Sequence, residues 1–176
     1  MLKKRYEAVI FDLDGTLLNT LEDLQASVNY AMKCHNMPEH SLEEIRCFVG
    51  NGIEKLIERA VVENTEESVR KAVLADFKVH YAIHCNDKTG LYPGISALLA
   101  KLKAQGFQMA IVSNKLQTGV DALYDKYFKE YLSVAIGARE GIYKKPAPDT
   151  VFEALRILNI PKEQAVYVGD SEVDIA

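Results

Sequence analysis

Two aspartates, Asp12 and Asp14, stand two positions apart where the apolar run 8–11 ends. Side chains at alternate positions of an extended chain point the same way, so both carboxylates can face one substrate. Such a pair can divide nucleophilic attack and proton transfer between its two members. Gly15 lets the backbone turn away steeply, and the hydroxyl of Thr16 can bond within that turn. The motif predicts a reactive centre at the end of a strand.

Three further groups of polar residues lie at the ends of predicted elements. They are Ser113, Asn114 and Lys115 after one apolar run, Lys144 and Lys145 before a helical pattern, and Asp170 and Asp174 after the last apolar run. Each group alone is a weak signal, because helix caps and solvated lysines often produce such patterns. Ligands of open parallel sheets sit at the carboxyl ends of the strands. We therefore expect all four groups to meet at one edge of a sheet.

A cluster of carboxylates at that edge requires cations. Two like charges about 4 Å apart cost on the order of 4 kcal/mol at an effective dielectric constant of about 20. Several such pairs would rival the stability of a whole domain, about 5–15 kcal/mol. The predicted ligands are all oxygens, with neither His nor Cys, and an open face for phosphate favours Mg²⁺ over Ca²⁺. The sequence therefore predicts a magnesium site.

The elements that position these groups are four short apolar segments with helical patterns between the later ones. The segments are Ala8–Phe11, Met109–Val112, Val134–Ile136 and Ala165–Val168. Strands that are covered on both faces lose their alternation and become continuous apolar runs, as these do. Residues 94–106 and 151–158 carry apolar side chains at helical spacing. This alternation predicts an α/β fold with a doubly wound, Rossmann-like parallel sheet.

One connection is much longer than a crossover helix requires. Within residues 19–91, Ser41 and Glu44 fit a capping box, and 53–61 and 65–84 follow helical spacing. We expect an all-helical insertion that forms a separate cap domain over the strand ends. The predicted division is a core of residues 1–16 and 92–176 and a cap of residues 17–91.

Composition is that of an ordinary globular protein: 176 residues, of which 48% are hydrophobic and 26% charged. The formal charge of −4 gives no support to a nucleic-acid or anionic-membrane partner. No apolar run is long enough to span a bilayer. Three widely spaced cysteines argue against a disulfide framework and fit a reducing cytoplasm. We expect a cytoplasmic protein that is a monomer or a weak homodimer.

Neighbouring cysteine and histidine residues suggest a zinc-binding site as an alternative. Cys34 with His35 and His84 with Cys85 are adjacent pairs without a C-x-x-C cluster, and His80 with His84 is only an i, i+4 pair on a predicted helix. Structural zinc sites cluster their ligands at characteristic spacings. Residues of a helix face are therefore the favoured interpretation.

With these motifs the sequence resembles the haloacid dehalogenase superfamily, and within it the phosphoglycolate-phosphatase-like members with a helical cap. The matching segments are DLDGTL (12–17), VSNK (112–115), KKPAPD (144–149) and VGDSEVD (168–174), with FVGNGIEKLIERA (48–60) similar to the cap. The resemblance covers essentially the whole chain. Its four motifs are specific for the superfamily and much less specific for the substrate.

The resemblance implies that Asp12 attacks phosphorus and becomes an aspartyl phosphate. Asp14 would protonate the leaving oxygen and later activate water; an acid here is the phosphatase pattern of the superfamily. Lys145, in preference to Lys144, would neutralise charge on the nucleophile and the phosphate. The remaining implied site residues are Ser113 and Asn114 on the phosphoryl oxygens, and Asp12, Asp14 through its backbone carbonyl, Asp170 and Asp174 at Mg²⁺.

The cap of such proteins sets specificity and gates access. Gly50 and Asn51 lie in a flexible turn expected to face the substrate. Arg46 and Lys55 are candidates to bind a substrate carboxylate or second phosphate, although a solvated helix charge is the simpler interpretation of each.

The implied function is that of a magnesium-dependent phosphatase that hydrolyses a small-metabolite phosphomonoester similar to phosphoglycolate. A sugar-phosphate mutase or pyrophosphatase on the same fold stays open, and so does a non-catalytic, phosphate-binding regulatory protein. Relatives of this kind continue beyond GDSEVDIA with a helix and at least one more strand, whereas this sequence stops at Ala176. We therefore expect a C-terminally truncated chain whose sheet has an unpaired edge beside the metal site.

Overall fold

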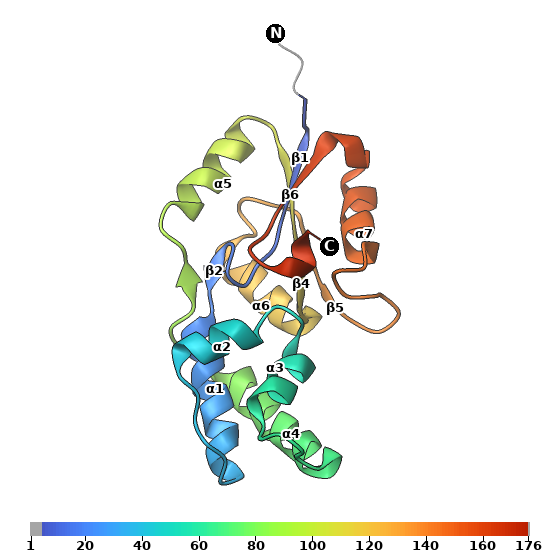
Figure 1. Ribbon diagram of the computed structural model, residues 1–176. Helices are drawn as coiled ribbons and strands as arrows, with labels where there is room; N and C mark the ends of the chain where they lie inside the picture. The colour runs from blue at the N-terminus through green and yellow to red at the C-terminus, as the bar shows by residue number, and fades with distance from the viewer. Residues whose placement is uncertain (1–4, 176) are drawn as a thin grey trace. The chain divides into compact units, whose positions relative to one another are not determined.

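The computed structural model describes residues 5–175 of the chain. The chain divides into two units, one made of Met1–Leu18 with Leu91–Ala176 and the other of Asn19–Gly90 (Figure 1). The two-residue strands β2 (Leu18–Asn19) and β3 (Gly90–Leu91) pair where the chain passes between these units. That the second unit acts as a cap stays a prediction.

The first unit is built on a parallel sheet of four strands in the order β5-β4-β1-β6. These strands are β1 (Ala8–Phe11), β4 (Gln108–Leu116), β5 (Val134–Ala138) and β6 (Ala165–Val168). In register, Ala8 lies opposite both Gln108 and Ala165. The four strands predicted from the sequence all form, and their parallel order confirms the predicted α/β class.

Strand β4 is longer than its apolar run. The sequence predicts an end at Val112, whereas the strand continues through Leu116, and its register to β5 shifts between these two residues. Hydropathy cannot detect the extension because three of its four residues are polar, although Ser113 and Asn114 are buried. The polar groups of this segment are therefore held by a strand rather than by a loop.

Helices cover both faces of the sheet, which explains the continuous apolar strands (Figure 1). The helices are α5 (Ile95–Ala104), α6 (Gln117–Tyr127) and α7 (Asp149–Leu158). Phe11 belongs to the core under α5 and α6, whereas its neighbour Ile10 belongs to the core under α7. The sequence analysis does not predict α6, because only Val120 and Leu123 of that helix are buried.

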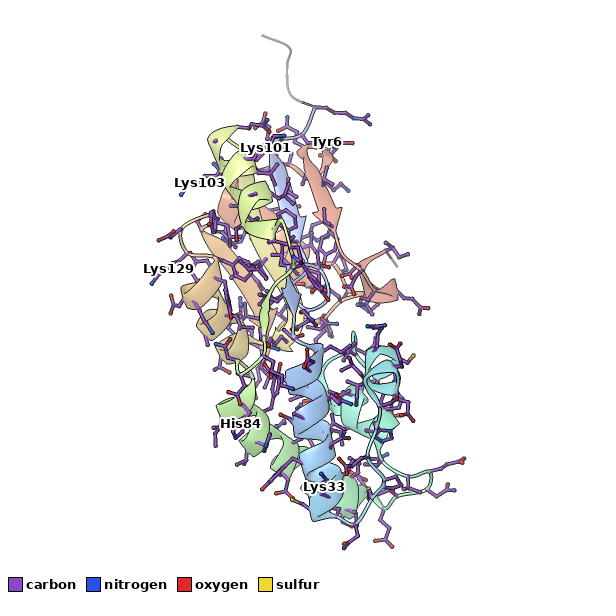
Figure 2. All side chains as sticks on the ribbon, turned by 90° about the vertical axis from the view of Figure 1, so that its left-hand side faces the viewer. Tyr6, Lys33, His84, Lys101, Lys103 and Lys129 are labelled. Carbon is purple, nitrogen blue, oxygen red and sulfur yellow. The ribbon has the colours of Figure 1, made fainter. Side chains whose placement is uncertain are left out.

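The second unit is helical between its two short strand ends. Its helices are α1 (Leu21–Cys34), α2 (Leu42–Phe48), α3 (Ile53–Ala60) and α4 (Glu67–His84), and Figure 2 labels Lys33 on α1 and His84 on α4. Their apolar faces form one core that includes Val28, Ile57 and Phe77. The capping box of α2 is confirmed: Ser41 Oγ accepts from the N–H of Glu44, whose side chain accepts from the N–H of Ser41. Within residues 5–175, no helix combines the length and hydropathy needed to cross a membrane.

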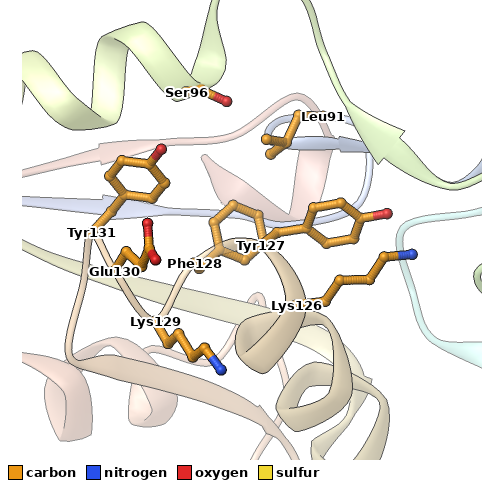
Figure 3. A pocket seen from close by; sticks show the side chains of 8 residues that line it. All are labelled: Leu91, Ser96, Lys126, Tyr127, Phe128, Lys129, Glu130 and Tyr131. Carbon is orange, nitrogen blue, oxygen red and sulfur yellow. The ribbon is translucent and has the colours of Figure 1, made fainter.

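A pocket of about 260 Å³ lies in the first unit at the end of α6 (Figure 3). Its lining consists of Lys126, Tyr127 and Phe128 at that helix end, Lys129, Glu130 and Tyr131 in the following connection, and Leu91 and Ser96. None of these residues belongs to the polar groups singled out in the sequence. The pocket is therefore separate from the candidate site described next.

Candidate active site

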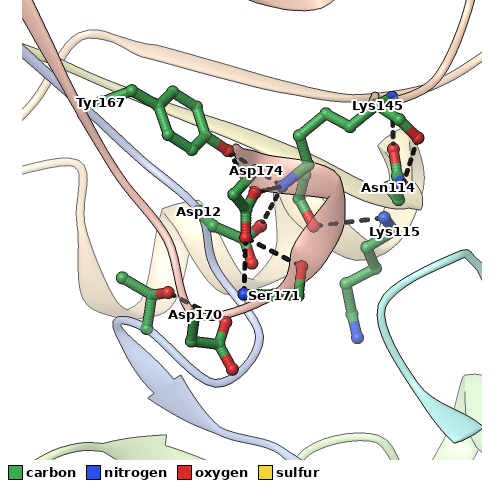
Figure 4. A network of polar contacts seen from close by, with 10 residues as sticks. Asp12, Asn114, Lys115, Lys145, Tyr167, Asp170, Ser171 and Asp174 are labelled. Atoms are coloured by element: carbon green, nitrogen blue, oxygen red, sulfur yellow. Dashed lines mark hydrogen bonds and ion pairs between the residues drawn. The ribbon is translucent and has the colours of Figure 1, made fainter. Parts of the chain in front are cut away.

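The polar groups from the first unit meet at the carboxyl edge of its sheet (Figure 4). They are Asp12 and Asp14 beyond β1, Ser113, Asn114 and Lys115 at the end of β4, Lys145 between β5 and α7, and Asp170 and Asp174 beyond β6. Asp12 extends the pairing of β1 with β6, because its N–H donates to the carbonyl oxygen of Val168 at 2.8 Å. Parallel strand order thus gathers residues that are distant in sequence.

Lys145 lies at the centre of this network, and its side chain is only 4% exposed. Its ammonium group donates to Asp12 Oδ1 at 2.7 Å, to Asp174 Oδ1 at 2.7 Å and to the Tyr167 hydroxyl at 2.9 Å. An ammonium group has three protons, so these acceptors satisfy it completely. The buried lysine therefore joins a carboxylate beyond β1 to a carboxylate beyond β6. Lys144, by contrast, is exposed.

The backbone of Lys145 is held by the side chain of Asn114. The amide nitrogen of Asn114 donates to the carbonyl oxygen of Lys145 at 3.0 Å, and its amide oxygen accepts from the N–H of Lys145 at 2.9 Å. The peptide bond that follows, Lys145–Pro146, is cis. The sequence predicts a phosphate contact for Asn114, but such a contact would have to compete with these two buried hydrogen bonds.

Asp12 is buried, and its environment makes ionisation costly. Burial raises the pKa of Asp12 to about 6, even though the charge and hydrogen bond of Lys145 act in the opposite direction. The nearby charges of Asp174 and Asp14 raise the pKa further by repulsion. A second cation beside Lys145 would therefore stabilise the ionised form of Asp12.

Three carboxylates lie close enough to share a metal ion. Asp12, Asp170 and Asp174 each offer one oxygen, and these oxygens lie within 4.8 Å of one another. Burial raises the pKa of Asp170, and the charge of Asp174 adds to this effect. An oxygen-only donor set with unfavourable mutual repulsion suits a hard divalent cation. The residues present therefore fit Mg²⁺.

Asp174 differs from the other two because both of its oxygens are already engaged. Oδ1 accepts from Lys145 and from the Tyr167 hydroxyl at 2.8 Å, and Oδ2 accepts from the N–H and hydroxyl of Ser171 at 3.0 and 2.8 Å. Burial raises the pKa of Asp174, but the hydrogen bond and charge of Lys145 outweigh burial and hold it below its usual range. Asp174 is thus better suited to orienting Lys145 than to direct coordination.

Two glycines allow close packing of the loop beyond β6, one where it meets the turn after β1 and one where it folds back on itself. Gly15 has a φ of 91°, and a Cβ atom there would lie 2.2 Å from Asp170 Oδ2. A Cβ atom at Gly169 would lie 2.3 Å from Asp174 Cγ. The Thr16 hydroxyl donates to Asp170 Oδ1 at 3.1 Å, so it bonds across to this loop, whereas the sequence predicts a bond within its own turn.

Lys115 is a residue of the cluster to which the sequence analysis assigns no role. Its Nζ lies 3.2 Å from Asp14 Oδ1, and its side chain is only 7% exposed. The N–H of Lys115 donates to the Ser113 hydroxyl at 3.2 Å. The signal that could have identified Lys115 is charge balance: four carboxylates were expected to converge with a single assigned lysine.

Tyr167 is the second functional residue that sequence reasoning missed. Its hydroxyl donates to Asp174 Oδ1 and accepts from Lys145 Nζ. Burial, followed by the charge of Asp12, raises the pKa of Tyr167, so the hydroxyl keeps its proton. In the sequence this tyrosine is one letter of an apolar strand, and nothing in that pattern distinguishes it from core packing.

The predicted substrate-binding residues of the insertion lie in the second unit. Arg46 pairs with Glu43 on the same helix, with Nη1 3.0 Å from Oε2. Asn51 accepts from Arg59 Nη2 at 2.8 Å, and Gly50 has a φ of 109°. Arg46 and Asn51 thus contact residues of their own unit, and the roles of all three residues toward a substrate stay predictions.

Comparison with known proteins gives consistent matches. The model of the haloacid dehalogenase-like hydrolase family matches residues 9–176. Phosphoglycolate phosphatase from Nitrosococcus oceani is 32% identical, over 98% of this chain and 79% of that protein. Phosphoglycolate phosphatase 1 from Pseudomonas aeruginosa is 34% identical, over 95% of this chain and 63% of that protein. The crystal structure of a Lactobacillus delbrueckii subsp. bulgaricus protein matches with a TM-score of 0.92 at 35% identity, over 97% of this chain and 81% of that chain.

These relatives agree with the enzyme class predicted from the sequence, a phosphoric monoester hydrolase, and they support a phosphatase. The chain spans less than two thirds of the Pseudomonas protein's length. The family match extends over nearly all of the chain, from within β1 through the loop beyond β6, and so includes every motif of the cluster. The chain therefore belongs to the haloacid dehalogenase-like hydrolases.

Proposed function

We propose that the protein is a magnesium-dependent phosphatase that hydrolyses a small phosphomonoester, of the phosphoglycolate kind, through an aspartyl phosphate on Asp12. The observation that carries the proposal is the buried Lys145 bridging Asp12 and Asp174, with Asp170 beside them. A structural salt bridge does not need a third carboxylate beside it. A phosphoryl-transfer site does need further charged groups, because it must hold a phosphate dianion and a divalent cation against a carboxylate nucleophile.

In the first step an oxygen of Asp12 attacks phosphorus, and the bond from phosphorus to the ester oxygen breaks. Asp14 gives a proton to the departing alkoxide, which leaves as an alcohol. In the second step Asp14 takes a proton from water as the water oxygen attacks phosphorus. The bond between phosphorus and Asp12 then breaks, which releases inorganic phosphate and restores the carboxylate.

Cations at the site make the first step possible. Lys145 already donates to Asp12 Oδ1, so it can offset charge on the nucleophile as the phosphoryl group approaches. Mg²⁺ held by Asp12, Asp170 and the backbone carbonyl of Asp14 would supply charge neutralisation at the phosphoryl oxygens. Ser113 accepts a hydrogen bond from Lys115 N–H, which leaves the proton of its hydroxyl to donate to a phosphoryl oxygen.

Lys115 has a defined part in this scheme. Its ammonium group lies 3.2 Å from Asp14 Oδ1. Lys115, at the end of β4, thus holds the carboxylate of Asp14, which lies beyond β1. When Asp14 carries a proton, the charge attraction between the two side chains is lost, and the ammonium group of Lys115 can attract an anionic group of the substrate. A compact substrate with two anionic groups, as in the names of the relatives, would offer it a partner.

The proposal is tested by inorganic phosphate release from 2-phosphoglycolate, pyrophosphate, a hexose 1-phosphate and an aryl phosphate, with Mg²⁺ and with a chelator. We expect release that requires Mg²⁺ and is fastest with 2-phosphoglycolate. Conversion of hexose 1-phosphate to its 6-phosphate, without release, would instead establish a mutase. A folded protein that binds Mg²⁺ and releases no phosphate from any of the four would contradict the proposal.

Asn114 provides a prediction that separates positioning of Lys145 from phosphate binding. Asn114→Ala removes both hydrogen bonds to the backbone of Lys145, so kcat should fall about tenfold or more while KM changes little. Ser113→Ala removes a proposed phosphate donor and should raise KM as well. Steady-state kinetics on both variants make the comparison. A rise in KM alone for Asn114→Ala would mean that its amide binds the substrate instead.

A further inference from the structure

The hydroxyl of Tyr167 lies at the junction of two charged groups of the candidate active site. It accepts from Lys145 Nζ at 2.9 Å and donates to Asp174 Oδ1 at 2.8 Å. Lys145 Nζ in turn donates to Asp174 Oδ1 at 2.7 Å, so the three polar groups close a triangle of hydrogen bonds (Figure 4). Each of the three groups is thereby held by the other two.

The ring that carries this hydroxyl is fixed by the sheet. Tyr167 stands in β6 opposite Ile10 of β1, and its side chain packs against the core under α7, to which Ile10 and Leu155 belong. Lys145 Nζ also lies 5.6 Å from the centre of the ring. A phenylalanine at this position could keep the packing and the ring contact, and it would lose only the two hydrogen bonds of the hydroxyl.

The three acceptors of Lys145 do not keep the same charge through the proposed reaction. Before the first step, Asp12 and Asp174 are both anionic partners, and the hydroxyl of Tyr167 is a neutral third. In the aspartyl phosphate, one oxygen of Asp12 is bonded to phosphorus and the other is a carbonyl oxygen without a full negative charge. The attraction between Lys145 and Asp12 is therefore weaker at that stage. Asp174 and Tyr167 then remain to hold the ammonium group.

We propose that Tyr167 is a positioning residue for the second step, the hydrolysis of the aspartyl phosphate, an inference that rests on the function proposed above. In that step the water oxygen attacks phosphorus, and a proton of the water passes to Asp14. The electron pair of the bond between phosphorus and Asp12 returns to the carboxylate. A lysine that is still in place at Asp12 Oδ1 stabilises the returning charge. Tyr167 keeps Lys145 there while Asp12 itself attracts it less.

The hydroxyl contributes less to the first step. There, Lys145 has two carboxylates at 2.7 Å, and the loss of one neutral acceptor leaves both of them in place. In the second step the same loss leaves Asp174 as the one anionic anchor of the original three acceptors. A hydroxyl that served only the stability of the fold would affect both steps alike. The difference between the steps therefore separates positioning from a structural role.

The test is the balance between the two steps in Tyr167→Phe. At saturating 2-phosphoglycolate and Mg²⁺, acid quenching and mass spectrometry give the ratio of protein phosphorylated on Asp12 to free protein. This ratio equals the rate constant of the first step divided by that of the second. We expect it to rise about tenfold, the effect of one hydrogen bond to a charged group. Because kcat/KM reports only the first step, kcat and KM should fall together, and kcat/KM should change by less than about threefold.

Tyr124→Phe is the matched control. The Tyr124 hydroxyl donates to the carbonyl oxygen of Leu132 at 2.9 Å, so this substitution also removes a phenol hydrogen bond, with a partner that is not part of the cluster. It should leave the ratio unchanged, and thermal unfolding checks that both variants fold. An unchanged ratio in Tyr167→Phe, or a fall in kcat/KM equal to the fall in kcat, would overturn the inference and leave the proposed function standing. A wild type that releases phosphate and never carries it on Asp12 would overturn the proposed function, and the inference with it.

Discussion

Replacing Asp12 by asparagine should abolish turnover and at the same time stabilise the metal-free protein. The amide cannot act as a nucleophile, so kcat should fall by at least about 10³-fold. The amide also removes a buried negative charge whose ionisation is opposed by burial and by the neighbouring carboxylates Asp174 and Asp14. A gain in stability from loss of a catalytic group is expected where a site holds like charges together for function.

The gain in stability of Asp12→Asn depends on pH, and its direction follows from the raised pKa of Asp12. Asp12 has its pKa raised from 3.8 to about 6 by burial, so the folded state binds its proton more tightly than the unfolded state. Stability contributed by the protonated carboxyl is therefore present at low pH and is lost as pH rises between these two values. The difference corresponds to about 3 kcal/mol of unfolding free energy.

Urea unfolding of both proteins without metal measures this effect. The Asp12→Asn variant should match the wild type at about pH 4 and exceed it by about 1–3 kcal/mol at about pH 8. Added Mg²⁺ should stabilise the wild type more than the variant, and the difference between their unfolding free energies at about pH 8 should therefore become smaller. Asp125→Asn, an exposed substitution on α6, is the control, because it makes the same chemical change away from the cluster and should alter stability by no more than about 0.5 kcal/mol. A variant that is less stable than the wild type at about pH 8 would contradict the account of Asp12.

Replacing Lys145 by methionine should have the opposite effect on stability and the same effect on activity. Methionine keeps much of the side-chain volume but leaves Asp12, Asp174 and the Tyr167 hydroxyl without their shared donor. Removing one partner of a buried ion pair lowers the unfolding free energy by about 3–5 kcal/mol, because the remaining charge is uncompensated. Turnover should be lost as well, since the nucleophile would lose the cation that favours its ionised form.

The neighbouring lysine supplies the matched control for this prediction. Lys144 is exposed and stands one position away, so Lys144→Met makes the same chemical change at an exposed position. That variant should keep its stability within about 0.5 kcal/mol, and its activity should stay close to that of the wild type. Thermal unfolding and phosphate release measure both properties. Loss of activity in Lys144→Met with retention in Lys145→Met would mean that the roles of the two lysines are reversed.

Much of the fold was predictable because it rests on short-range patterns. Continuous apolar runs identify strands covered on both faces, and β1 and β6 have the predicted bounds. The capping box at Ser41 is equally local, since both of its hydrogen bonds span three residues. The convergence of Asp12 with Asp170 needed only the rule that parallel strands end at one edge.

The parts that escaped prediction depend on contacts between distant residues. Helix α6 has few buried positions, so its periodicity is faint, and the polar end of β4 does not resemble a strand. The resemblance implies a phosphate contact for Asn114, and that role stays a prediction, but no local pattern indicates that Asn114 also bonds the backbone of Lys145, 31 positions away. Tyr167 looks like core in the sequence, and its function comes from meeting Lys145 and Asp174. Only the folded chain reveals such partners.

The most direct test of the central claim is to find where the phosphoryl group goes. The protein would be mixed with 2-phosphoglycolate and Mg²⁺, quenched in acid within the first turnover, and its peptides examined by mass spectrometry. The account predicts phosphate on the peptide that contains Asp12 and none in Asp12→Asn. Phosphate on another side chain, or phosphate release that continues in Asp12→Asn, would contradict it.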